Sequence, residues 1–305
     1  MSGRPVKPRD FHQLPLWWNI IFNCIAGGFA LLCILPFLFV VLISFTDEGV
    51  LARDGYQFIP AKWSTLAYQY IFDSGDTLLR AYGVSLTVTL TGTLVSLLLI
   101  SLYAYAISRK SFKYRHFFTF FAFFTMLFNG GLVPTYMIVT QLLGLKDSIW
   151  ALVLPLAVNA FYIMILRTFY ITSVPDALME SAKIDGAGEF RIFLSIVLPL
   201  SLPGLATIGL FSTLGYWNDW FNALLYIDNP DLVPLQSLLM RIETSMQFIL
   251  QNSQNSSLSL EALRSMPQDT SRMAMVVLAT GPAIFAYPFF QRYFIQGLTV
   301  GAVKE

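Results

Sequence analysis

Charged side chains are scarce in this sequence, and their scarcity excludes several classes of protein. Only 12% of the 305 residues are Asp, Glu, Lys or Arg, whereas 56% are hydrophobic. Soluble domains carry roughly 25% charged residues, so a water-soluble globular protein is excluded. The net charge of +1, without a basic face or aromatic-basic interleaving, also argues against a nucleic-acid partner.

Residues that form disulfides and metal sites are almost missing. The chain has two cysteines, Cys24 and Cys33, in one apolar run, and two histidines, His12 and His116, each just before an apolar run. With so few ligands we expect neither a disulfide framework nor a metal site. The sequence has no G-x-x-x-x-G-K-[ST] phosphate loop and no G-x-S-x-G nucleophile turn. We therefore expect no enzyme activity and no cofactor bound by this chain.

What the sequence has instead is a series of apolar runs of membrane length. A helix of about 20 apolar residues crosses a hydrocarbon core. Six runs reach that length, which predicts an all-α polytopic membrane protein built as one domain over residues 1–305. The expected spans cover about 17–45, 84–107, 117–143, 149–170, 200–226 and 273–294.

The distribution of basic residues orients these spans, because Lys and Arg favour cytoplasmic segments. If the N-terminus is cytoplasmic, the inner segments hold twelve of the nineteen basic residues. The run SRKSFKYRH then marks an inner loop between the second and third spans. Both termini are therefore expected in the cytoplasm.

The loop between the fourth and fifth spans, residues 173–199, is unusually charged for this chain. Pro175 and Asp176 predict the start of a helix, with Asp176 as its cap. Gly186 predicts a bend in which a residue without a side chain adopts positive φ. A second short helix is expected over 189–197 before the fifth span. Composition alone is equally consistent with a solvated connector.

The spacing within this loop carries a more specific signal. Seven residues fit the pattern E-A-A-x3-G-x9-I-x-L-P, with serine for the middle alanine: Glu180, Ser181, Ala182, Gly186, Ile196, Leu198 and Pro199. This pattern resembles the EAA motif of ABC importer permeases. The stretches 129–155 and 297–305 are similar to those of carbohydrate-type inner-membrane permeases, the MalG-like LplC/YtcP subgroup.

The resemblance implies a fold, a role and a set of partners. The fold is the MetI/MalG-like permease fold, in which loop 173–199 is a coupling helix that docks on a cytoplasmic ATPase subunit. The docking residues are those of the motif together with Asp185. The implied partners are a homologous second permease subunit, two ATPase subunits that bind ATP and Mg²⁺, an extracytoplasmic solute-binding protein, membrane lipid and an oligosaccharide. The implied location is a bacterial cytoplasmic (inner) membrane, where the tail 297–305 reaches the ATPase subunits.

Polar and aromatic side chains within the expected spans are candidates for the substrate pathway. Intramembrane polar groups usually face a bundle interior or a water-filled cavity, and aromatic faces combined with amides suit sugars. On a continuous fifth span, two amides share one face and two indoles share a neighbouring one. Anchoring at the membrane interface is the competing interpretation for the indoles. The candidates are Trp217, Asn218, Asp219, Trp220 and Asn222, followed by Asn129, Asn159 and Tyr162.

Two other functions compete with an ATP-driven sugar importer. A secondary transporter or channel subunit acting without ATP usually shows internal repeats or broken helices around midplane charges, and the sequence shows neither clear halves nor a mid-span ion site. A membrane-embedded enzyme needs a catalytic cluster, which the sequence lacks. The leading hypothesis is therefore a permease subunit that couples closure of the ATPase subunits to alternating access.

Overall fold

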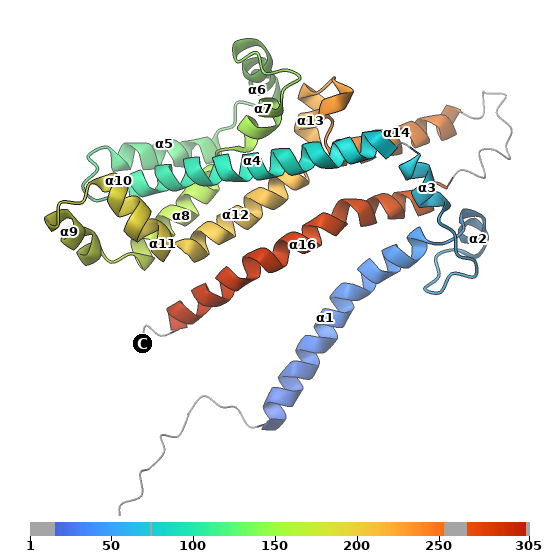
Figure 1. The fold of residues 1–305 in the computed structure, drawn as a ribbon, viewed down its shortest axis with the longest axis horizontal. Helices are drawn as coiled ribbons and strands as arrows, with labels where there is room; N and C mark the ends of the chain where they lie inside the picture. The colour runs from blue at the N-terminus through green and yellow to red at the C-terminus, as the bar shows by residue number, and fades with distance from the viewer. Residues whose placement is uncertain (1–15, 74, 253–266, 303–305) are drawn as a thin grey trace, which may run out of the picture. The chain divides into compact units, whose positions relative to one another are not determined.

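The computed structural model describes residues 16–73, 75–252 and 267–302 (Figure 1). All regular secondary structure in these ranges is helical, apart from one antiparallel bridge between Thr46 and Trp63. The predicted all-α class is confirmed. The described residues fall into two compact units, one made of 16–68 with 267–277 and the other of 69–252 with 278–302.

The first unit is built around an apolar helix. Its helices are α1 (Leu16–Ser44), α2 (Glu48–Asp54) and the first turns of α16 (Asp269–Ala302). The segment Trp17–Ser44 is apolar enough to cross a membrane, and none of its most apolar window is buried within the described protein. The carboxylate of Glu48 accepts hydrogen bonds from the backbone N–H groups of Asp269 (3.1 Å) and Thr270 (3.0 Å). Glu48 thus satisfies two donors at the start of α16 that the helix itself leaves open.

The second unit holds the remaining helices. They are most of α3 (Leu66–Phe72), then α4 (Gly75–Ser108), α5 (Arg115–Leu127), α6 (Leu132–Met137), α7 (Ile149–Val153), α8 (Ala160–Ser173), α9 (Asp176–Ile184), α10 (Glu189–Ile192), α11 (Leu198–Leu200), α12 (Leu202–Trp217), α13 (Phe221–Tyr226), α14 (Leu235–Asn252) and the rest of α16. Helix α4 lies alongside α8 and α12 and packs against both (Figure 1). A buried cluster that includes Ile100, Leu166 and Ile208 fills the space between these three helices.

A second contact brings α4 and α12 unusually close. Tyr216 of α12 is buried, and its ring lies directly over Gly92 of α4, where an added Cβ would sit 2.5 Å from the ring. Its hydroxyl donates to the carbonyl oxygen of Val153 at 2.8 Å and lies 3.1 Å from the Ser96 hydroxyl. Only glycine leaves room for an aromatic ring at this crossing, so Gly92 fixes the separation of the two helices.

Two of the expected spans, 117–143 and 149–170, bend sharply within their length, and a third bend separates the loop helix from the fifth span. The helical segments on either side of a break meet at 115° within 115–142, at 53° within 149–173 and at 81° within 189–217. At the first break Gly131 adopts φ +89°, and the side-chain oxygen of Asn129 accepts its N–H at 2.8 Å. In an apolar environment, a backbone N–H group that loses its helical hydrogen bond needs another acceptor nearby. The side chain of Asn129 provides one.

By length and composition, two described helices can cross a membrane unaided. Three bent pairs raise the number to as many as five if each pair forms one span. The two continuous segments are Trp17–Ser44 and Gly75–Ser108. The sixth expected span, 273–294, lies within the 34-residue helix α16.

Replacing Gly92 by alanine should destabilise the protein by about 1–3 kcal/mol, because overpacking displaces the Tyr216 ring. The control is Gly83→Ala in the same helix, where an added Cβ meets nothing within 4 Å. That variant should be neutral or slightly stabilising, since alanine favours the helix by roughly 0.5–1 kcal/mol. Apparent melting temperatures of the purified variants in detergent measure both effects. Equal melting temperatures for the two variants would contradict the proposed close contact.

Candidate functional site

The charged loop 173–199 forms two short helices, as expected, but its first helix begins differently. Pro175 is the residue before α9, and no side chain caps the helix start. The expectation that Asp176 is the cap is therefore wrong. Its carboxylate instead forms an ion pair with Lys110 at 2.6 Å. The hydrogen bond from Lys110 holds the pKa of the Asp176 carboxyl below its usual value of 3.8.

The end of α9 is shaped by Gly186, which adopts φ +80°. The N–H of Gly186 donates to the carbonyl of Lys183 at 3.0 Å, and the N–H of Ala187 donates to that of Ala182 at 2.9 Å. These two bonds are the pair that closes a helix in a Schellman motif with glycine in the left-handed position. The predicted positive φ at Gly186 is confirmed, and it sets the direction in which the chain leaves α9.

The inner face of the loop is packed into the core of the spans. Met179, Ile192, Phe193 and Val197 are buried in the same cluster that holds α4, α8 and α12 together. Among the motif residues, Ala182, Ile196 and Leu198 are partly buried against this cluster. The apolar half of the motif therefore attaches the loop to the spans.

The outer face of the loop carries the remaining motif residues. Glu180, Ser181, Gly186 and Pro199 are exposed, and so is Asp185, which lies outside the motif. The Glu180 carboxylate forms no hydrogen bond or ion pair within the described part of the chain, while the Ser181 hydroxyl donates to the carbonyl of Ala177 at 2.9 Å. Large apolar side chains are also exposed, most of all Ile184 at 87% and Phe190 at 67%. An exposed surface that combines apolar and charged side chains is typical of an interaction site.

Glu189 is the residue that the sequence reasoning missed. Its carboxylate accepts a hydrogen bond from the Tyr105 hydroxyl at 2.6 Å and forms ion pairs with Lys183 at 2.5 Å and Arg109 at 3.4 Å. It thereby joins α10 to α9 and to the end of α4. Only the position of Glu189 directly after Gly188 hints at a special role. Nothing in the sequence pairs it with residues about eighty positions earlier.

The fifth span changes course at the predicted substrate residues. Helix α12 ends at Trp217, and α13 starts at Phe221. Asp219 accepts hydrogen bonds from the backbone N–H of Asn222 at 3.2 Å and from its side-chain amide at 2.8 Å. The side-chain amide of Asn218 donates to the carbonyl of Leu214 at 2.9 Å. The expected pair of neighbouring faces on one continuous helix is therefore wrong, because these polar groups stabilise a break.

The two tryptophans at this break have different surroundings. Trp217 is buried, and its indole N–H donates to the carbonyl of Ala279 in α16 at 2.9 Å. Trp220 is 39% exposed and borders a cavity of about 520 Å³ between α13 and α14. The polar groups lining this cavity are Ser237, Arg241, Thr244 and Ser245. The indole of Trp220 thus lines a cavity together with the side chain of Arg241.

The three further candidates lie away from this cavity. Asn159 caps α8 and accepts from the N–H of Phe161 at 2.9 Å, whereas Asn129 accepts from the N–H of Gly131, the residue before α6, at 2.8 Å. Tyr162 stacks on Phe211 with ring centroids 6.1 Å apart. Among the described residues, no group of three His, Cys, Asp or Glu side chains is placed to hold a metal ion.

Comparison with known proteins gives concordant matches over most of the chain. The family described as the binding-protein-dependent transport system inner membrane component matches residues 98–300. The chain is 41% identical to the polygalacturonan/rhamnogalacturonan transport system permease protein YtcP of Bacillus subtilis (strain 168), covering 94% of this chain and 99% of that protein. Protein LplC of the same organism is 39% identical, over 94% of this chain and 93% of the relative.

A solved structure is similar as well. It is described as a bacterial ABC transporter involved in the import of the acidic polysaccharide alginate. The match has a TM-score of 0.74 at 27% identity and covers 95% of this chain and 100% of the matched chain. The predicted permease family and fold are confirmed by these matches.

Replacing Glu189 by glutamine should lower the stability of the protein by about 1 kcal/mol. Hydrogen bonds to a charged group contribute about 1.5–3 kcal/mol, and the half-exposed setting of this carboxylate weakens them. The control is Glu180→Gln, which removes an exposed carboxylate without a partner in the described chain and should leave stability unchanged. Apparent melting temperatures measure both. A Glu189→Gln variant as stable as the control would show that the carboxylate does not join the helices.

Proposed function

Since the chain belongs to the family of inner membrane components of binding-protein-dependent transport systems, it is a permease subunit of an ABC importer, and we propose that it admits oligosaccharides. The family is one of transport permeases rather than of enzymes. The proposal extends to its assembly: a homologous second permease, two ATPase subunits that bind ATP and Mg²⁺, and an extracytoplasmic solute-binding protein. This chain itself binds no cofactor in this scheme.

The observation that carries the proposal is the two-sided construction of loop 173–199. Its inner side chains are buried among the spans, whereas Glu180, Ile184 and Phe190 are exposed. In the proposed mechanism the exposed side docks on an ATPase subunit. Closure of that subunit then displaces the loop, and the buried contacts pass the displacement to α4, α8 and α12. An ATP-independent transporter or channel would have no need for a surface of this kind.

The orientation in the membrane is part of the same proposal. Loop 173–199 and both termini lie on the cytoplasmic side of a bacterial inner membrane, because the basic residues concentrate there. The cavity beside Trp220 then opens on the outer side, where α14 follows the fifth span. Lipid contacts the apolar surface of α1. A substrate that enters from outside thus reaches the Trp220 cavity before it reaches the cytoplasmic side, where loop 173–199 lies.

We further propose that the oligosaccharides are acidic. The Trp220 cavity combines an indole, three hydroxyl groups and the guanidinium of Arg241. Arg241 donates to the carbonyl of Ile227 at 2.9 Å, which leaves other N–H donors of the same group for a ligand. A fixed cation suits the carboxylate of a uronic acid. Polygalacturonan and alginate, which appear in the names of two similar proteins, are both polymers of uronic acids.

Replacing Gly186 by valine should uncouple transport. An L-residue in the left-handed region costs about 1–2 kcal/mol, so α9 would end differently and the docking surface would turn. The control is Gly188→Val, where φ is −71° and an added Cβ meets nothing within 4 Å. In proteoliposomes of the assembled complex, uptake and substrate-stimulated ATP hydrolysis should fall at least about tenfold in Gly186→Val only. If both variants transport normally, the loop does not couple the two processes.

Replacing Arg241 by glutamine should reduce the uptake of acidic substrates more than the uptake of neutral ones. Loss of a hydrogen bond to a charged group, about 1.5–3 kcal/mol, should reduce uptake of a trigalacturonate about tenfold or more. Uptake of a neutral arabino-oligosaccharide should change little, and Arg241→Lys should restore part of the loss. Equal losses for acidic and neutral substrates would indicate a structural role. No loss for either would place the recognition of acidic groups elsewhere.

A further inference from the structure

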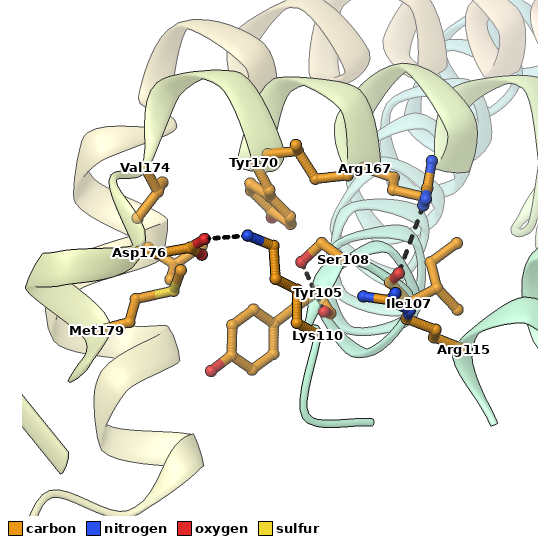
Figure 2. A pocket seen from close by; sticks show the side chains of 12 residues that line it. Tyr105, Ile107, Ser108, Lys110, Arg115, Arg167, Tyr170, Val174, Asp176 and Met179 are labelled. Atoms are coloured by element: carbon orange, nitrogen blue, oxygen red, sulfur yellow. Dashed lines mark hydrogen bonds and ion pairs between the residues drawn. The ribbon is translucent and has the colours of Figure 1, made fainter. Parts of the chain in front are cut away.

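A cavity of about 170 Å³ lies where α4 ends, between α8 and α9 (Figure 2). It is far larger than the ~10–15 Å³ that holds one water molecule. Three basic side chains line it: Lys110 and Arg115 from the segment after α4, and Arg167 from α8. One carboxylate, that of Asp176 in α9, also lines it. The cavity shares no lining residue with the Trp220 cavity, and the proposed transport mechanism assigns it no ligand.

The charges in this cavity do not balance. Lys110 is paired with Asp176 at 2.6 Å. The Nε of Arg167 donates to the carbonyl of Ile107 at 3.4 Å, and the Nε of Arg115 donates to the ring of His116 at 3.2 Å. Neither arginine forms an ion pair with a carboxylate in the described part of the chain. Two half-buried guanidinium groups thus have no counter-ion among the described residues.

A buried hydroxyl group at the same cavity also lacks a partner. Tyr170 is 3% exposed and lines the cavity, and its hydroxyl makes no hydrogen bond to any described residue. Figure 2 shows its ring among the basic side chains. By contrast, the neighbouring Tyr105 donates to Glu189. Leaving a buried hydroxyl unpaired is unfavourable. A ligand that accepts a hydrogen bond from this hydroxyl would therefore be stabilised in the cavity.

From these features we propose that the cavity binds a phosphate group. Two guanidinium groups supply N–H donors and a phenolic hydroxyl supplies an O–H donor, and guanidinium groups match phosphate geometry with two parallel hydrogen bonds. Either the headgroup of an anionic phospholipid or free inorganic phosphate presents this chemistry. The membrane end of a helix bundle is where basic pockets meet lipid headgroups. The inference does not depend on which substrate is transported.

Occupation of the cavity would strengthen the attachment of the loop. A phosphate held by Arg115 and Arg167 ties the start of α5 to α8. Lys110, from the same segment as Arg115, holds α9 through Asp176. The bound anion would therefore stabilise the arrangement in which α9 is packed against the spans. Membrane composition or phosphate concentration would thereby tune how firmly the loop is held.

The test uses the assembled complex in nanodiscs and follows its apparent melting temperature. One arm compares discs of phosphatidylcholine with discs that also contain phosphatidylglycerol. The other adds inorganic phosphate to phosphatidylcholine discs at constant ionic strength, with chloride as the reference anion. The variants are the double change Arg115→Gln/Arg167→Gln, and Tyr170→Phe. The control is Lys113→Gln, an exposed basic residue of the same segment that does not line the cavity.

We expect one of the two anions to raise the melting temperature of the wild type and of Lys113→Gln alike. A response to phosphatidylglycerol alone identifies a lipid headgroup, and a response to inorganic phosphate identifies the soluble source. Most of the rise should disappear in the double variant. Tyr170→Phe should match the wild type without anion, since its hydroxyl has no internal partner, yet lose about half of the rise.

Three results overturn the proposal. The first is the absence of any response in the wild type, and the second is an equal response in the wild type and the double variant. The third is loss of the ATPase subunits from the double variant with an unchanged anion response, which would mean that a partner carboxylate fills the cavity. If the double variant does not fold, Tyr170→Phe decides, and a rise equal to that of the wild type overturns the proposal.

Discussion

Burial of the loop's apolar side chains in the core of the spans is the constraint on which the other features depend. Phe193 and Val197 share one cluster with Ile100, Leu166 and Ile208. Protein interiors are close-packed and respond to strain as connected bodies, so the loop cannot be displaced without moving α4, α8 and α12. The carboxylate of Glu189 adds a polar connection to the same junction. In the proposed mechanism, the exposed motif residues act on this connected body from outside.

Polar residues within the spans serve mainly to end helices. Asn129, Asn159 and Asp219 each accept backbone N–H groups at a break. In an apolar environment a chain that leaves the helical path must satisfy its own donors, and short amides and carboxylates do so locally. A polar residue in a membrane span therefore need not face a substrate. Among the residues proposed for the substrate pathway, Trp220 lines a cavity that Arg241 also lines.

The sequence alone was sufficient to predict the features that local patterns encode. Apolar run length gives the helical class, and the motif spacing gives the loop, its turn at Gly186 and the family. The breaks were missed because hydropathy records whether a run is apolar and not whether it is straight. The partners of Glu189 were missed because Tyr105 and Arg109 are distant in sequence and neither has an unusual local context. Likewise, nothing in the sequence places Arg115 beside Arg167.

The bend at Ser201 has a mechanical consequence. The segment Glu189–Leu200 meets α12 at 81°. The two therefore form the arms of an angled lever and not one straight helix. At a rise of 1.5 Å per residue, the shorter arm is roughly 18 Å long. A displacement of its far end across the membrane plane becomes a tilt of α12 about the bend, instead of a shift along its axis. A lever of this kind converts a small movement on one side of the membrane into a change of angle on the other.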